Sequence, residues 1–203
     1  VEAAFCLALA SLKTQAWRDE VLQAAQRAVE LHRELGDRQR LTHSLVRCAA
    51  TGMAREADWV DAAIAEAAEL IDDSTPTRLR ALVAMIHGSR ALGLHDFDAA
   101  RVAFGKQAEL YRQGGEVAGE YAALINLGMV SLDAGEIDEA VATLRRAMEG
   151  LRRVKAQFNL SSASTLYAVA LAVQGDHADV LPLARQGYDH ASQMGGGYHA
   201  FKP

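Results

Sequence analysis

The side chains that could ligate a metal or transfer a proton are scattered along this chain of 203 residues. The sequence contains no HExxH and no CxxC, and no two histidines are four residues apart, which are spacings that zinc sites use. The histidines are His32, His43, His87, His95, His177, His190 and His199. His95 and His177 fall in expected turns, where a polar role beside a helix end is favoured over metal binding. We therefore predict no metal site.

Residues that could act as nucleophiles or hold a phosphate also lack the partners they would need. Ser161-Ser162 and Ser164-Thr165 have no histidine or acid at a fixed spacing that could activate a hydroxyl. Gly105-Lys106-Gln107 lacks both the glycine spacing and the Ser/Thr of a phosphate-binding loop. We predict that the chain is not an enzyme and that it has no catalytic residue and no cofactor site.

Composition and charge narrow the class of partner. Half of the residues (50%) are hydrophobic, mostly Ala and Leu, and the net charge is −5. This charge does not supply the positive field that nucleic acid or an anionic membrane requires. The longest apolar runs are far shorter than the ~20 residues that span a bilayer, and no targeting signal is visible. We expect a cytoplasmic protein whose partner is a protein, a peptide or another domain, without nucleic-acid or membrane contact.

One expected helix carries a basic cluster. Its members are Arg145, Arg146, Arg152, Arg153 and Lys155. We interpret this cluster as a solvated convex face that Glu139 and Glu149 partly neutralise, and an anion or nucleic-acid site is the alternative.

The two cysteines, Cys6 and Cys48, lie near equivalent positions of two expected helices. They could approach each other in space, but buried free thiols are the favoured interpretation in a cytosolic protein.

The elements that position these residues are clearest between Tyr121 and Val154. Two apolar-periodic runs, Ala122 to Leu132 and Ile137 to Leu151, predict two amphipathic helices. Gly135 lies between them and can take the left-handed conformation that ends the first helix. The sequence therefore predicts a helical hairpin here.

One hairpin cannot bury its apolar faces alone, and the pattern recurs along the chain with a 40-residue period. Small residues occupy the eighth position of each unit: Ala8, Cys48, Gly88, Gly128 and Ala168. Larger residues occupy the twenty-fourth position of the central units: Ile64, Phe104 and Leu144. The predicted repeats span residues 1–40, 41–80, 81–120, 121–160 and 161–197 of a single domain.

The conspicuous break in this pattern is the stretch from Asp72 to Pro76. We predict that it is a loop whose Ser74 or Thr75 caps the next helix. That helix is expected to run from Thr77 through Gly93, and its hairpin partner from Phe97 to Gln113.

The start of the sequence also fits the repeat register. The chain does not begin with Met, and Val1 falls on the first position of a repeat. We therefore expect a fragment of a longer protein that begins at a repeat boundary.

The unit resembles the tetratricopeptide repeat (TPR). The residues that meet its pattern are Leu124, Leu127-Gly128, Ala140, Leu144 and Ala147. The resemblance implies an all-α fold, an α-α superhelix in the form of a right-handed solenoid of about five helical hairpins and ten helices. The first two repeats depart from the pattern, since Glu20 and Val60 replace the small residue of position twenty.

Two helix-ending phrases, Glu30 to Asp37 and Glu109 to Glu116, together with the 40-residue spacing, resemble the longer TPRs of bacterial signal-transduction proteins. Those proteins include regulators of the maltose-activator type, peptide-sensing regulators and TPR-bearing cyclases. The resemblance implies a sensor or interaction module within a transcriptional or other regulatory protein. No output-domain motif lies in this sequence.

The resemblance also implies that positions 2, 5, 9 and 12 of each first helix point into a concave groove. Only one of these twenty positions, Glu2, is ionisable, which argues against a groove that clamps an acidic peptide terminus. Such an apolar groove receives a hydrophobic ligand or helix, packs against a second copy in a homodimer, or forms core between neighbouring first helices. The residues we single out on this face are Phe5, Leu9, Leu45, Met85, Ile125 and Met129.

Asn126 is the polar residue we add to this candidate site. It occupies the sixth position of its helix, where peptide-binding TPRs often carry an Asn that bonds a ligand backbone. The same residue is common in TPRs without a ligand, so a structural role is the alternative.

Overall fold

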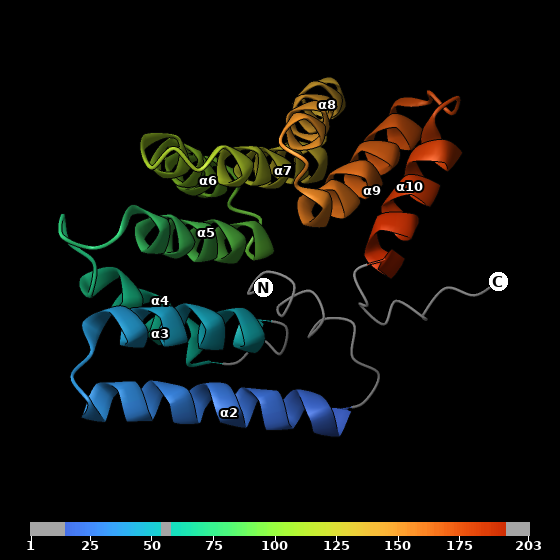
Figure 1. The fold of residues 1–203 in the computed structure, drawn as a ribbon. Coiled ribbons are helices and arrows are strands. Elements are labelled where there is room, and N and C mark those ends of the chain that lie inside the picture. Colours follow the sequence, from blue (N-terminus) through green and yellow to red (C-terminus); the bar gives the residue numbers. More distant parts are fainter. Residues whose placement is uncertain (1–14, 54–57, 194–203) are drawn as a thin grey trace.

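The computed structural model describes residues 15–53 and 58–193, and all regular secondary structure in these ranges is helical (Figure 1). The start of the first predicted repeat, residues 1–14, lies outside them. The helices of the described ranges are α2 (Gln15–Glu34), α3 (Arg38–Met53), α4 (Val60–Glu69), α5 (Thr77–Gly93), α6 (Phe97–Gln113), α7 (Val117–Asp133), α8 (Ile137–Arg153), α9 (Gln157–Gln174) and α10 (Val180–Gln193).

The helices stack as successive hairpins, and apart from the α4–α5 junction each helix packs closely on the next one in the chain. Alternate helices also touch, as α3 does with α5 and α7 with α9. In Figure 1, α2, α3 and α5 lie in successive layers, and α8, α9 and α10 turn away from the direction of those layers. The core is divided into clusters along this stack, the largest of which lie among α2–α5 and among α7–α10. The prediction of an all-α solenoid without a central core is therefore confirmed.

A constant register governs the central part of the chain. Helices α5 to α9 begin at residues 77, 97, 117, 137 and 157, so each start follows the last by half of one repeat. Each of these helices is followed by one residue of positive φ, and these residues are His95, Gly115, Gly135, Lys155 and Gly175. The next backbone N–H donates to the carbonyl five residues back, at 2.8–3.0 Å in all five turns. This Schellman geometry confirms the left-handed Gly135 and sets the same reversal at every turn.

The two helices of a hairpin approach each other closely where a glycine faces a large side chain. A Cβ placed on Gly128 would lie 2.5 Å from Leu144, and one on Gly88 would lie 2.7 Å from the Phe104 ring. Leu144 and Phe104 are completely buried. The predicted pairing of a small eighth position with a large twenty-fourth position is thus confirmed in these two hairpins.

The α3–α4 hairpin exchanges large and small residues at another contact. Val60, whose size was at odds with the repeat pattern, is only 1% exposed, because Gly52 opposite it leaves room for the side chain. The equivalent residues one repeat later are Leu92 and Ala100, which are buried together in one cluster. In one repeat the second helix supplies the larger residue and in the next repeat the first helix does, so the total side-chain volume at the contact is similar. Glu20 has no described side chain.

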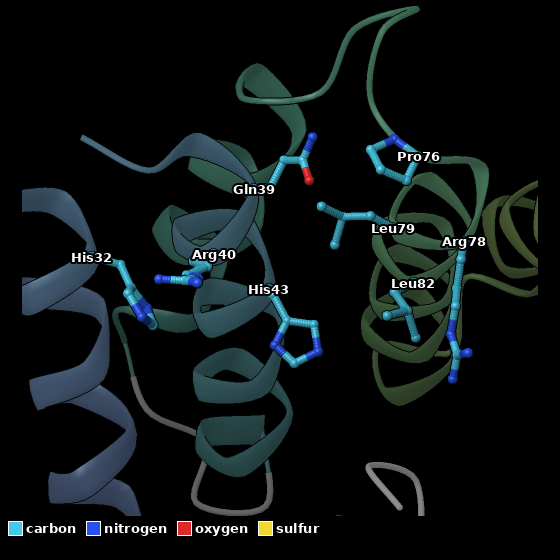
Figure 2. A pocket seen from close by; sticks show the side chains of 8 residues that line it. All are labelled: His32, Gln39, Arg40, His43, Pro76, Arg78, Leu79 and Leu82. Carbon is cyan, nitrogen blue, oxygen red and sulfur yellow. The ribbon is translucent and has the colours of Figure 1, made fainter. Parts of the chain in front are cut away.

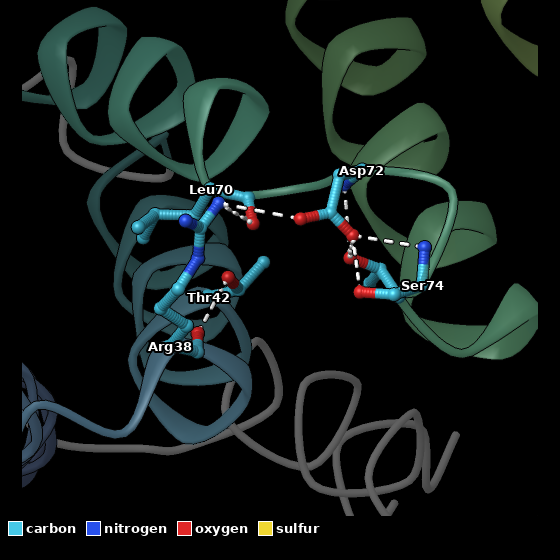
Figure 3. A network of polar contacts seen from close by, with 6 residues as sticks. Arg38, Thr42, Leu70, Asp72 and Ser74 are labelled. Atoms are coloured by element: carbon cyan, nitrogen blue, oxygen red, sulfur yellow. Dashed lines mark hydrogen bonds and ion pairs between the residues drawn. The ribbon is translucent and has the colours of Figure 1, made fainter.

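The α4–α5 junction breaks the register. Helix α4 has 10 residues, whereas α5 to α8 have 17 each. The loop that follows is built around Asp72, whose Oδ1 accepts from Ser74 N at 2.9 Å and from Ser74 Oγ at 2.6 Å (Figure 3). These hydrogen bonds, with a smaller contribution from Arg38, lower the pKa of Asp72. Arg38 donates to Leu70 O at 3.0 Å and so ties the loop to α3.

The predicted cap of α5 was wrong. The residue that precedes the helix is Pro76, and no side chain caps its first turn. Thr75 Oγ1 instead accepts from Asp72 N at 2.9 Å, because the loop's own amides compete for the short hydroxyl side chains.

Two of the five turns have a residue other than glycine at the position of positive φ, and we expect glycine there to stabilise the protein. Lys155 has φ 56° although it carries a side chain, and left-handed backbone costs such a residue about 1 kcal/mol. We expect Lys155→Gly to raise the free energy of unfolding by about that amount. His95→Gly should gain less, because the ring of His95 meets that of Phe97 edge to face at 6.0 Å. Urea denaturation measures both.

Gly135→Ala is the matched control for these substitutions. Its Cβ would meet nothing within 4 Å, so the expected loss of about 1 kcal/mol comes from the backbone alone. An unchanged or lower stability of Lys155→Gly would contradict the assigned turn geometry.

Candidate ligand-binding site

The structure divides the predicted groove residues into two groups. Phe5 and Leu9 lie outside the described residues. Leu45 is 2% exposed and Ile125 is 6% exposed, and each belongs to a core cluster. Met85 and Met129 are half-buried and pack on the same small cluster, which Leu92, Ala100, Phe104 and Val130 form. The structure therefore brings the two methionines of the candidate site together and uses the two branched residues as core.

Asn126 is engaged inside the protein. Its Nδ2 donates to Gln107 Oε1 of α6 at 3.1 Å, and Gln107 is only 3% exposed. Burial raises the pKa of the neighbouring Tyr111, which also shares a hydrogen bond with Gln107. The hydrogen bond to Gln107 thus places the Asn126 amide in the α6–α7 interface.

The apolar stripe opens to solvent at α9. Val169 is 43% exposed, and Val173, one turn further on, is 59% exposed. Thr165 and Ala172 are exposed as well. In α3, the residues that correspond to Thr165, Val169 and Ala172 are Leu45, Ala49 and Gly52, and all three are buried. The accessible part of the stripe thus lies in the C-terminal half of the described chain.

A separate cavity of about 520 Å³ lies between α2, α3 and α5 (Figure 2). Its lining residues are His32, Gln39, Arg40, His43, Pro76, Arg78, Leu79 and Leu82. None of these residues is acidic, and four carry a cationic or titratable nitrogen group. Figure 2 shows His43 on the α3 side of the gap, with Leu79 and Leu82 across from it on α5. The cavity thus combines a basic side, to which all three helices contribute, with an apolar part that Pro76, Leu79 and Leu82 form.

Hydrogen bonds and ion pairs fix part of the basic side. Nδ1 of His32 lies 2.8 Å from Oγ of the buried Ser44. Arg40 approaches Asp37 at 3.4 Å, and Arg78 approaches Glu116 at 4.0 Å. Both distances exceed the roughly 2.7–2.9 Å typical of a charge-assisted hydrogen bond. The two guanidinium groups therefore retain capacity for a further anionic partner.

Sequence reasoning missed this cavity, although a signal was present. Arg38-Gln39-Arg40 and Arg78-Leu79-Arg80 lie in the first turns of α3 and α5, at equivalent places of successive repeats. Neither turn contains an acid, although Asp37, just before α3, accepts from Arg40 N at 3.0 Å. A helix N-terminus is electropositive and favours acidic side chains. Arginines in the first turns of both helices go against this preference, which indicates that they do not serve helix stability.

Other candidate chemistry is limited in the described part of the chain. No group of three His, Cys, Asp or Glu side chains within residues 15–53 and 58–193 could hold a metal ion. Cys48 is a buried free thiol, as predicted, and burial raises its pKa to about 11, which keeps it protonated and unreactive. Cys6 lies outside this part. None of the helices found there has the length and apolar character to cross a membrane.

The basic cluster of α8 differs from the prediction in its partners. Arg152 donates to Gln186 at 2.6 Å and Arg153 to the Tyr121 hydroxyl at 3.1 Å. Glu139 and Glu149 lie on the same helix and are exposed. Among the described residues no ion pair joins the cluster to either acid, so the predicted partial neutralisation does not take the form of direct pairs.

Comparison with known proteins shows the fold. No protein-family model matches the chain, and no curated protein matches it in sequence. The crystal structure of BtubC (BKLC) from P. vanneervenii is 14% identical, with 94% of this chain and 96% of that chain covered, at a TM-score of 0.57. The crystal structure of the MamA protein is 18% identical, with 91% of this chain and 100% of that chain covered, at a TM-score of 0.52. Both are TPR-like helical-repeat proteins, and the likeness gives this chain a TPR-like fold.

Proposed function

We propose that this solenoid is a non-catalytic scaffold that binds an apolar peptide or helix of a partner along its first helices. The observation that carries the proposal is the apolar stripe of alternate helices, which is half-buried at Met85 and Met129 and exposed at Val169 and Val173. Concave faces of helical-repeat arrays are extended surfaces suited to such segments.

The chemistry of the stripe determines the type of occupant. None of the exposed or half-buried positions named on α5, α7 and α9 carries a charge, so an acidic or basic segment would find no counter-ion there. Methionine side chains adapt to irregular apolar surfaces. The favoured partner segment is therefore an amphipathic helix or an extended apolar peptide.

The regulatory setting extends the proposal. The 40-residue spacing and the phrases that end the second helices resemble the longer TPRs of bacterial signal-transduction and transcriptional regulators. In that setting the chain acts in the cytoplasm as the sensor or interaction module of a larger regulatory protein. The partner is then another protein or a domain of the same parent chain.

A homo-oligomerisation module is the second candidate function. Leu181 is 76% exposed and Tyr188 is 45% exposed on one face of α10. Their counterparts one repeat earlier, Val141 and Met148, pack on the cluster shared by α7 to α10. This exposed apolar face of α10 could therefore pack against a second copy of the chain. In such a dimer the apolar groove would be buried as well.

Binding that depends on the groove can be measured with selected peptides. A displayed peptide library selected on the folded chain should yield apolar peptides that bind the wild type. Val169→Glu should weaken these peptides at least about tenfold, because it places a charge where apolar surface is buried. Val102→Glu is the matched control, since Val102 is 75% exposed on α6 and lies outside the stripe. Isothermal titration measures the affinities.

Light scattering coupled to size exclusion distinguishes the second candidate function. The scaffold proposal expects monomers of the wild type, Met129→Glu and Val102→Glu over a wide concentration range, with equal helicity. If the wild type is a dimer and Met129→Glu converts it to a folded monomer, the groove is a self-association surface and not a site for a partner peptide. Selected peptides that bind all three proteins equally would refute a role for the stripe.

The role of Asn126 gives another prediction. Asn126→Ala leaves the buried Gln107 amide without this partner, so we expect a loss of about 1–2 kcal/mol in the free energy of unfolding. A double-mutant cycle with Gln107→Ala should show coupling between the two positions. Unchanged stability combined with loss of peptide binding would assign Asn126 to the ligand instead.

A further inference from the structure

We propose that the cavity between α2, α3 and α5 binds a small organic anion, in which one carboxylate or phosphate group is attached to a compact apolar body. The cavity is distinct from the exposed stripe of α9, and this inference does not depend on the proposed scaffold function. Its volume of about 520 Å³ is typical of small-molecule sites, which span roughly 300–1,000 Å³.

The charge of the lining selects an anion. The protein carries a net charge of −5, yet the eight lining residues include two arginines, two histidines and no acid. The side chains of Arg40 and Arg78 are 70% and 67% exposed, and their acidic neighbours Asp37 and Glu116 lie 3.4 and 4.0 Å away. By contrast, Arg33 is committed to a bidentate contact with Glu66 at 2.7–2.8 Å. Arg40 and Arg78 are thus the guanidinium groups with donors to offer.

The other two arginines of the same pattern have a different role. Arg38 lies 3.7 Å from Asp72, and Arg80 lies 3.9 Å from Asp73. Both acids belong to the loop between α4 and α5, which these arginines face, and Arg38 also donates to Leu70 O at 3.0 Å. Each Arg-x-Arg pair therefore contributes one residue to the loop and one to the cavity.

His32 adds an oriented imidazole ring. Its Nδ1 is held at 2.8 Å by the Ser44 hydroxyl, and Ser44 is 6% exposed, so the ring orientation is fixed from the protein side. Where Ser44 donates this hydrogen bond, the proton of the neutral imidazole is on Nε2, which is then a donor. The amide of Gln39 supplies a further donor group to the same lining.

The apolar side of the cavity requires more than a bare ion. Pro76, Leu79 and Leu82 come from α5 and the residue before it, and of these Pro76 is exposed and Leu82 half-buried, whereas Leu79 is buried. Inorganic phosphate would leave this surface in contact with water. An aryl or short alkyl group attached to the anion would cover it and gain the corresponding burial energy.

The test uses three aromatic probes and one inorganic ion. Phenyl phosphate and phenylacetate should bind and shift the imidazole NMR signals of His32 and His43, and their relative affinity distinguishes a phosphate from a carboxylate ligand. Phenylacetamide, which has a similar shape without charge, should bind at least about tenfold more weakly, as should inorganic phosphate. Equal binding of phenylacetamide would overturn anion recognition, and equal binding of inorganic phosphate would overturn the apolar component.

Substitutions locate the site. Arg40→Gln should weaken phenyl phosphate about tenfold, while Arg40→Lys should recover part of the affinity because it keeps the charge without the planar fork. Arg145→Gln is the matched control, since it removes one exposed cation of α8 and should leave the affinity unchanged. Circular dichroism verifies that each variant is folded. Equal losses for Arg40→Gln and Arg145→Gln would show general electrostatic attraction and would overturn the assignment.

Discussion

The hydrogen bond that closes each inter-helix turn is the constraint on which the central architecture depends. After each helix from α5 to α9 one residue takes a positive φ, and the following N–H bonds to the carbonyl five residues earlier. The same turn therefore follows first and second helices alike, and it returns the chain at a constant geometry. Because alternate helices then hold the same place in successive repeats, side chains one repeat apart are equivalent, which is how Met85, its successor Ile125 and Thr165 come to lie along one stripe.

Close packing across each turn depends on complementary sizes rather than on particular residues. Glycine faces Phe104 and Leu144 in two hairpins, whereas Gly52 faces Trp59 and Val60 in an earlier one. Val60 departs from the repeat pattern, because the pattern expects a small residue at this position of the second helix. The structure satisfies the same volume with the sizes reversed, and this explains how the α3–α4 hairpin keeps its core despite a weak match to the repeat.

The sequence was sufficient to predict α5 and α6 to the residue, because their apolar periodicity, glycines and turn residues all agree. It was less informative where tertiary contacts decide. Periodicity placed Leu45 and Ile125 with Met85 on one face, but only packing determines that the first two are covered. Likewise, the repeat pattern at Asn126 is compatible with a ligand-binding or a structural role. The hydrogen bond of Asn126 depends on Gln107, which lies on another helix. The paired arginines of α3 and α5 were a signal for the cavity, but the sequence does not show that they line one space, since the lining comes from three helices and a loop end.

The break in the register is also where the cavity lies. A shortened α4 and the loop from Leu70 to Pro76 replace a compact turn, and Pro76 at the end of that loop lines the cavity. Cations in the first turns of α3 and α5 are unfavourable next to the positive ends of the helix dipoles. The exposed ion pairs of Arg40 with Asp37 and of Arg78 with Glu116 contribute a stabilisation of similarly small size. Helix stability therefore supplies no net reason for these two arginines. An anion in the cavity would supply one, because the lining arginines keep donors that their acidic neighbours do not occupy.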